Sequence, residues 1–287
     1  MRNTVYALVA SVAAAGISLP ATAAAQNPWV TDTGSALAVS LTHTLTENNE
    51  FGTASALADI SARWQVSPHY WVGVGIPVVH ADLNLPAGYF GMARTAATEA
   101  GNPWIGFGGS IDRKTSFVVA VRPGIRKNDD LDYAGQAAVV LGGYSDFDHL
   151  EAWSDDRSSL RAYLQIGAIP EAGAFATGWF GGTYVPGRNG SESTPLLDYG
   201  LRVGYRGRGV IAAVRLSGRY DATSCGGCDL SLGDRMINQV ALSVEAASGK
   251  VRPMGGVGIF LDPSVRSDSP DGTGIHAMIT AGLAVGM

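Results

Sequence analysis

The chain has 287 residues, of which 46% are hydrophobic and only 16% are charged. Soluble globular domains carry about 25% charged residues, so this composition is typical of a protein whose exterior is partly solvated by lipid. The formal net charge of −5, without a run of basic residues, argues against nucleic acid as a partner.

Residues 1–25 have the features of a secretory signal peptide. Arg2 supplies a positive start, Val5–Leu19 form an apolar run, and Ala23–Ala25 provide the small residues that precede a cleavage site. The apolar run is shorter than the roughly 20 residues that a membrane-spanning helix needs, which argues against an anchoring helix. We therefore expect cleavage after Ala25 and a single exported domain over residues 26–287.

The rest of the chain is dominated by stretches in which every second residue is apolar. In Val210–Tyr220, Arg215 and Arg219 alternate with apolar neighbours. Successive side chains of a strand point to opposite faces, so such a stretch has an apolar face and a charged face. In chain order, the alternation predicts strands at residues 37–45, 56–66, 70–78, 105–111, 117–126, 137–141, 160–166, 174–184, 197–206, 210–220, 239–246, 251–261 and 275–287. Long loops, such as 81–101 and 222–234, alternate with short turns.

Repeated amphipathic strands in an exported chain are the sequence pattern of a transmembrane β-barrel. The sequence therefore predicts an all-β fold, a closed antiparallel transmembrane barrel in the bacterial outer membrane. The predicted strands number thirteen, although an even number is expected when both ends lie in the periplasm. Splitting residues 134–156 into strands at 137–141 and 149–153 gives fourteen, which we prefer. Twelve is the alternative, and it requires one predicted strand to be wrong.

The last predicted strand runs to the C-terminus. Its odd-numbered residues from Ile275 to Met287 form an unbroken apolar face. An exposed apolar edge promotes aggregation unless it is paired, so we expect this strand to close the barrel onto the first one. Barrels of bacterial outer membranes usually end in Phe or Trp, and Met287 departs from that pattern. Outer-membrane lipid and the barrel-assembly machinery are the partners that this arrangement implies.

The charged faces of the strands are the candidate functional site. If the apolar faces contact lipid, the lumen receives Asp59, Arg63, Arg122, Arg126, Arg161, Asp198, Arg202, Arg206, Arg215, Arg219, Glu245 and Arg252. Nine arginines against three acids predict a cationic interior. Positive lining charges raise the energy barrier to cations. Two interpretations stay open: a water-filled lumen that favours anions, and a plugged lumen in which arginines and acids pair.

Other conspicuous residues have structural interpretations. Cys225 and Cys228 are the only cysteines. In an exported chain we expect a disulfide between them, since a redox motif would open a helix and a zinc site would need four ligands. Aromatic girdles at the membrane interfaces are expected from residues near strand ends, and a hydrophobic path lined by aromatic rings is the alternative. The girdle candidates include Trp64, Trp71, Trp104, Trp153 and Trp179.

The sequence predicts no enzymatic activity, cofactor or metal. The five histidines are scattered, and none lies in a nucleophile motif. Catalytic triads are recognised by geometry rather than by spacing, so a barrel hydrolase stays as an alternative.

The stretch from Arg63 to Arg126 resembles a family of bacterial outer-membrane barrels associated with phenol-degradation pathways and transport. The matching residues are Val66–Pro77, a strand, turn and strand ending in Ile-Pro, and Gly101–Gly106, where many relatives have Gly-Leu-Gly-Asp. The resemblance covers about a quarter of the chain and implies a channel or transporter for small compounds, hydrophobic ones among them. We therefore expect diffusion of a small-molecule solute, with a structural or surface-interaction barrel without conductance as the alternative.

Overall fold

The structure, a computed structural model, describes residues 36–46, 53–84, 94–126, 131–145, 151–187, 193–223, 236–261 and 275–286. The predicted signal peptide and the Cys225–Cys228 pair lie outside these residues, so both stay predictions.

The described residues form thirteen β-strands and one α-helix. In chain order these are β1 (Ala36–Thr46), β2 (Thr53–Gln65), β3 (Tyr70–Asn84), β4 (Arg94–Ala100), β5 (Trp104–Ser110), β6 (Thr115–Arg122), α2 (Tyr133–Ser145), β7 (Ser159–Ile166), β8 (Gly173–Val185), β9 (Thr194–Arg206), β10 (Val210–Asp221), β11 (Met236–Ala246), β12 (Val251–Phe260) and β13 (Ile275–Gly286).

The sheet is antiparallel throughout and closes where β1 pairs with β13. β4 pairs with Val78–Asn84 of β3, and β5 pairs with Tyr70–Gly75 of the same strand. β4 and β5 are therefore one passage of the barrel wall, broken between Ala100 and Trp104. The described residues thus form a closed barrel of twelve strands. The preferred count of fourteen is wrong, and the twelve-strand alternative is confirmed.

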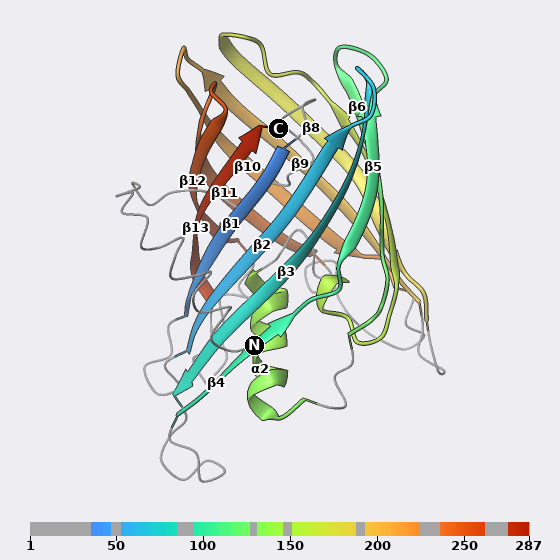
Figure 1. Cartoon of the computed structure of the whole chain (residues 1–287), viewed down its shortest axis with the longest axis vertical. Coiled ribbons are helices and arrows are strands. Elements are labelled where there is room, and N and C mark those ends of the chain that lie inside the picture. Colours follow the sequence, from blue (N-terminus) through green and yellow to red (C-terminus); the bar gives the residue numbers. More distant parts are fainter. Residues whose placement is uncertain are drawn as a thin grey trace.

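Residues 134–156 caused the miscount. The structure has α2 where a strand was predicted at 137–141, and the described part of the strand predicted at 149–153, residues 151–153, is a 3₁₀ turn. Every residue of Ala137–Leu141 is apolar, and a short apolar run fits a buried helix as well as a strand. α2 packs against β1–β4, where Ala138 joins Leu57 and Val79 in one buried cluster. Because those two strand side chains point inward, the helix lies inside the barrel, beside β3 and β4 in Figure 1.

Among the described residues, no helix has the length and apolar character needed to cross a membrane.

Side-chain burial alternates along the strands as a barrel wall requires. In β10, Val214 is 51% exposed whereas Arg215 is 7% exposed, so the apolar face points outward and the charged face inward. Short turns at residues 66–69, 111–114, 167–172, 207–209 and 247–250 lie at the upper end in Figure 1, together with the end of β13. Short turns face the periplasm in outer-membrane barrels, so we name this the periplasmic end.

The long loop predicted at 81–101 is wrong at both of its ends. β3 continues to Asn84, and β4 returns along it as an antiparallel partner. Four of the seven residues of β4 are Ala or Glu, which are depleted in strands. The edge offered by the extended β3, rather than local propensity, therefore makes this segment a strand.

The aromatic-girdle prediction is wrong for four tryptophans. Trp64 is 44% exposed on the outer face, but buried positions are occupied by Trp71, Trp104, Trp153 and Trp179. A girdle-like group lies instead at the periplasmic end of the outer face, where the ring centroids of Tyr70 and Phe107 are 5.6 Å apart and those of Phe107 and Phe117 are 5.7 Å apart. Strand parity, and not distance from a turn, decides which aromatic side chains face inward.

Candidate functional site in the barrel interior

The charged residues singled out in the sequence lie along the inner face and at its ends. Buried side chains belong to Arg63, Arg122, Arg126, Arg161, Asp198, Arg202, Arg215 and Arg219. Half-buried side chains belong to Asp59, Arg206, Glu245 and Arg252. Most of these charges are therefore shielded from bulk water in this conformation, and their partners inside the barrel decide what the interior can do.

The arginines of β6, β7 and β10 meet at one carboxylate, that of Glu151. Its Oε1 lies 3.3 Å from Arg122 Nε and 3.1 Å from Arg161 Nη1, and its Oε2 lies 3.6 Å from Arg219 Nη2. The Glu151 side chain has no exposed surface. Glu151 belongs to the connection between β6 and β7, whose described parts, residues 123–126, 131–145 and 151–158, we name the inserted segment. Because a buried charge needs partners, these contacts hold the inserted segment in the interior.

Asp198 of β9 extends this network from the opposite side. Its Oδ1 accepts a hydrogen bond from Arg219 Nε at 2.5 Å, and its Oδ2 lies 3.8 Å from Arg161 Nη2 and accepts a hydrogen bond from the Thr183 hydroxyl at 3.0 Å. Three arginines and two acids leave the cluster with one net positive charge (3 − 2). Charge-assisted hydrogen bonds of this kind are stronger than neutral ones, so the cluster is a rigid part of the interior.

The other inner arginines have partners of their own. Arg202 donates to Glu245 Oε1 at 3.4 Å, and Arg215 donates to Gln239 Oε1 at 3.1 Å. Arg202 and Arg215 are directly opposite each other in the β9–β10 register, an arrangement of like charges that Glu245 offsets. Further contacts join Arg126 to the Trp153 carbonyl, Arg206 to the Ala247 carbonyl and Arg63 to the face of the Trp71 ring.

Asn102 joins the break in the barrel wall to the inserted segment. Its Oδ1 accepts hydrogen bonds from the backbone N–H groups of Ile125 and Arg126 at 3.1 and 3.0 Å, and its Nδ2 donates to the Ser154 carbonyl at 2.9 Å. Its backbone N–H donates to the Ala152 carbonyl at 2.6 Å. The broken strand therefore exposes backbone and amide groups to the interior, and the inserted segment satisfies them.

The sequence count of inner acids missed Glu99 and Asp221 of the wall and Glu151 and Asp155 of the inserted segment. Glu151 lies on the inserted segment, and Glu99 of β4 is in register with the inward-facing Val79 and interacts electrostatically with Arg126. On the inner face of the wall, eight arginines stand against five acids, since Arg126 belongs to the inserted segment. This leaves an excess of three positive charges (8 − 5) where the sequence predicted six (9 − 3). The excess itself was the available signal, because six like charges in one interior require acids from elsewhere in the chain.

One side of the interior is apolar. A cluster of buried residues from β3, β5, β6, β7 and β8 consists of Trp71, Trp104, Val118, Ala120, Tyr163 and Trp179. The Trp104 ring covers Gly75, where a Cβ atom would lie 2.5 Å from Trp104 Nε1. Glycine therefore makes room for a large inward-facing ring on the neighbouring strand. The interior thus combines an aromatic side with a cationic side.

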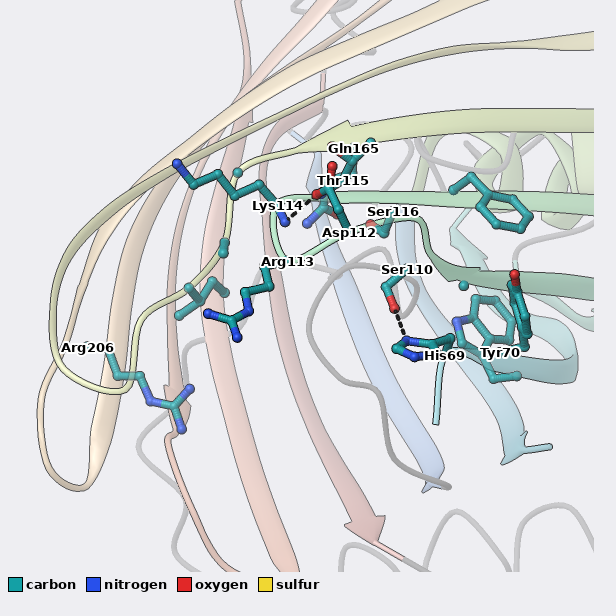
Figure 2. Close-up of a pocket in the computed structure, with 16 residues that line it drawn as sticks. His69, Tyr70, Ser110, Asp112, Arg113, Lys114, Thr115, Ser116, Gln165 and Arg206 are labelled. Carbon is teal, nitrogen blue, oxygen red and sulfur yellow. Dashed lines mark hydrogen bonds between the residues drawn. The ribbon is translucent and has the colours of Figure 1, made fainter. Parts of the chain in front are cut away.

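A cavity of about 300 Å³ lies at the periplasmic end of the barrel. Figure 2 shows Arg113, Lys114 and Arg206 along one side of it and His69 and Tyr70 along the other. The first three side chains come from two different parts of the wall, the β5–β6 turn and the end of β9. Asp112 also lines the cavity, so the periplasmic mouth carries an excess of two positive charges (3 − 1).

A histidine and a serine approach each other in this cavity, although the sequence did not predict the pair. His69 Nδ1 and Ser110 Oγ are 3.3 Å apart (Figure 2). A hydrolytic triad needs an acid that orients the histidine. Asp112 instead caps its own turn, because its Oδ1 accepts hydrogen bonds at 2.7 Å from the backbone N–H groups of Lys114 and Thr115. Both hydrogen bonds lower the pKa of Asp112, and the one from Lys114 has the larger effect.

Comparisons with known proteins establish the fold. No family model matches the sequence, and no curated protein matches it. Among solved structures, an outer membrane channel from Pseudomonas putida F1 is similar with a TM-score of 0.56 and 10% identity, over 92% of this chain and 100% of that chain. LpxR from Salmonella typhimurium is similar with a TM-score of 0.50 and 8% identity, over 88% of this chain and 100% of that chain.

Identities this low establish a shared fold and nothing finer. They support the outer-membrane barrel that the family resemblance implied, and its association with phenol degradation stays a prediction. The fold of this chain is that of a bacterial outer-membrane β-barrel.

Proposed function

We propose that this protein is an outer-membrane channel for small solutes that favours anions, and that the inserted segment closes it in the conformation described. The observation that carries the proposal is the excess of three positive charges (8 − 5) on the inner face of the closed barrel wall. A cationic lining lowers the barrier to anions and raises it for cations. The fold shared with an outer membrane channel supports the same conclusion.

Passage requires the inserted segment to move. The side chains of Arg122, Arg161 and Arg219 are only 4–6% exposed while Glu151 is in place. Glu151 is held to the wall by ion pairs, and Asn102 of the wall is held to the inserted segment by hydrogen bonds. Water and solute ions compete for both kinds of contact. A closed conformation and an open one are therefore both compatible with the same barrel wall.

A barrel without conductance is the second candidate, and one specific observation favours it. The ion pairs that fill the interior are those expected of a permanent plug, because acids from both the wall and the inserted segment neutralise arginines.

The aromatic side of the interior favours small hydrophobic compounds as solutes within the channel proposal.

Reversal potentials across planar bilayers test the proposal. With a potassium chloride gradient, we expect the potential at zero current to shift toward the value for chloride. Arg206→Gln at the periplasmic cavity should reduce this preference, whereas Arg208→Gln, an exposed residue in the next turn, should leave it unchanged. A preference for potassium would contradict the proposal, as would a purified, folded barrel that never conducts.

A further inference from the structure

We propose that Arg122, Arg161 and Arg219 form a carboxylate-binding site, that Glu151 occupies it as an internal ligand, and that a small carboxylate solute takes its place when the inserted segment leaves. The exchange step rests on the proposed channel function. The binding site itself rests only on the contacts of the interior.

The three guanidinium groups are placed for a carboxylate. They come from β6, β7 and β10 and approach both oxygens of Glu151, two of them at Oε1 and one at Oε2. Planar guanidinium groups match the two in-plane oxygens of a carboxylate. All three arginines belong to the barrel wall, while the carboxylate belongs to the inserted segment. Site and ligand are therefore on parts of the chain that can separate.

The wall holds this site in shape without help from Glu151. Asp198 contacts Arg161 and Arg219, and it is itself held by hydrogen bonds from the hydroxyl groups of Thr183 and Tyr163 at 3.0 and 3.4 Å. Arg122 Nη1 donates a hydrogen bond to the Asn102 carbonyl at 2.7 Å. Removing the inserted segment leaves these contacts intact. The arginines then keep the positions that a carboxylate needs, which limits the entropy cost of binding.

Charge balance couples the exit of Glu151 to the entry of an anion. With Glu151 bound, the cluster of three arginines and two acids carries one net positive charge (3 − 2). Without it, the same cluster carries two (3 − 1). The additional positive charge attracts an anion to the site. One monocarboxylate restores the original balance, so it favours the conformation in which the inserted segment is released.

The surroundings of the site indicate what such a solute looks like. The guanidinium group of Arg161 lies over the Tyr163 ring, 4.4 Å from its centroid, and Tyr163 belongs to the apolar cluster with Trp71 and Trp179. A carboxylate held by Arg161 therefore has an aromatic surface beside it. The site fits a monocarboxylate with a small apolar body.

Chemical rescue tests the site without any measurement of transport. Glu151→Ala removes a methylene and a carboxylate, which is the size of one acetate ion. We expect thermal unfolding in detergent to occur at a lower temperature than in the wild type when the salt is potassium chloride. Potassium acetate at the same ionic strength should raise the unfolding temperature of this variant by about 3 °C or more, because a ligand that binds only the folded state stabilises it.

Three matched controls identify the cause of any rescue. Glu151→Gln removes the charge but fills the space, so acetate should not raise its unfolding temperature. Acetamide, a neutral analogue of acetate, should not rescue Glu151→Ala. Glu245→Ala vacates a carboxylate outside the Glu151 cluster, which contacts Arg202, so its response to acetate should be smaller.

The outcomes separate this inference from the channel proposal. If Glu151→Ala fails to fold in chloride, the folded fraction obtained by refolding in acetate and in chloride becomes the readout. Equal responses to acetate and chloride, or equal rescue of Glu151→Ala and Glu151→Gln, overturn the site. Acetate rescue in a barrel that is silent in bilayers supports the site and contradicts the channel. Anion conduction without acetate rescue supports the channel and overturns the site.

Discussion

Asn102 shows how one side chain can fix a long connection inside a barrel. It has no exposed surface, and its amide makes hydrogen bonds with three backbone groups on two parts of the inserted segment. Its position in the break between β4 and β5 leaves its own backbone outside the sheet ladder. The residue therefore acts by positioning the inserted segment.

Asn102→Ala should lower the free energy of unfolding by about 2–4 kcal/mol, because it leaves several buried backbone groups without hydrogen bonds. Urea titration of the detergent-solubilised protein measures this change. Asn238→Ala is the matched control, since Asn238 Oδ1 accepts one hydrogen bond from the Tyr199 hydroxyl and should cost about 1 kcal/mol. Equal losses in the two variants would contradict the positioning role of Asn102.

Gly75 lies beneath the ring of Trp104, so it tests the packing of the aromatic side of the interior. An added Cβ would lie 2.5 Å from Trp104 Nε1 and 2.7 Å from its Cε2. Gly75→Ala should therefore destabilise the barrel by about 1–3 kcal/mol through overpacking. Gly209→Ala, where a Cβ meets no atom within 4 Å, should change stability by less than about 0.5 kcal/mol. An unchanged free energy of unfolding in Gly75→Ala would show that the Trp104 ring is not fixed over residue 75.

Single residues differ in how far the sequence could place them. Alternation was enough to put Arg215 and Arg219 on the face opposite to Val214, because strand geometry dictates it. Alternation also placed Asp198, one partner of Arg219, on the inner face. It could not find the second partner, Glu151, which lies outside the strands and is separated from Arg219 by 68 positions in the sequence (219 − 151). Long-range ion pairs leave no local pattern in a sequence.

Among the secondary-structure elements, α2 lies inside the barrel, against the inner face of β1–β4. Ala138 is fully buried in the cluster that joins α2 to Leu57 and Val79 of the wall, whereas Val140 on the same helix is 57% exposed. Helix and wall therefore meet through one small apolar face. This contact, the Glu151 ion pairs and the Asn102 hydrogen bonds are described attachments that must break before the segment can leave.

Ala138→Asp should detach α2 while the strands stay folded, because it places a carboxylate in the apolar contact. We expect trypsin to cleave within residues 123–158 at a rate higher by about tenfold or more, since cleavage follows the population of the open form. Fragment masses identify the cleaved bonds. Val140→Asp, on the exposed face, should leave the rate unchanged. Equal rates of trypsin cleavage in Ala138→Asp and Val140→Asp would mean that α2 is not held by this cluster.

The elements that the sequence predicted well are those whose faces differ most in polarity. β10, with arginines on one face and aliphatic residues on the other, has nearly the predicted limits. β4 and α2 were missed because their sequences, RTAATEA and YAGQAAVVLGGYS, have no such contrast. Tertiary contacts with β3 decide the conformation of both, and local patterns do not contain that information.

The whole molecule is a closed barrel whose seam joins its first and last described strands. β1 and β13 pair along their length, and the hydroxyl groups of Thr42 and Thr280 are 2.9 Å apart on the inner side of this seam. The predicted closure of the last strand onto the first is therefore confirmed. The strand count was harder to predict, because one apolar run inside the barrel resembled another strand of its wall.

The central claim is that the inserted segment closes an anion-favouring pathway. The backbone N–H of Asp156 donates to the Arg126 carbonyl at 2.7 Å, so a short Gly-Ser linker from residue 126 to residue 156 can replace residues 127–155 with both strand ends kept. We expect this variant to conduct several times more current per barrel than the wild type in planar bilayers, with a preference for anions, because the inner arginines then face water. Conductance equal to that of the wild type, or a preference for cations, would contradict the account.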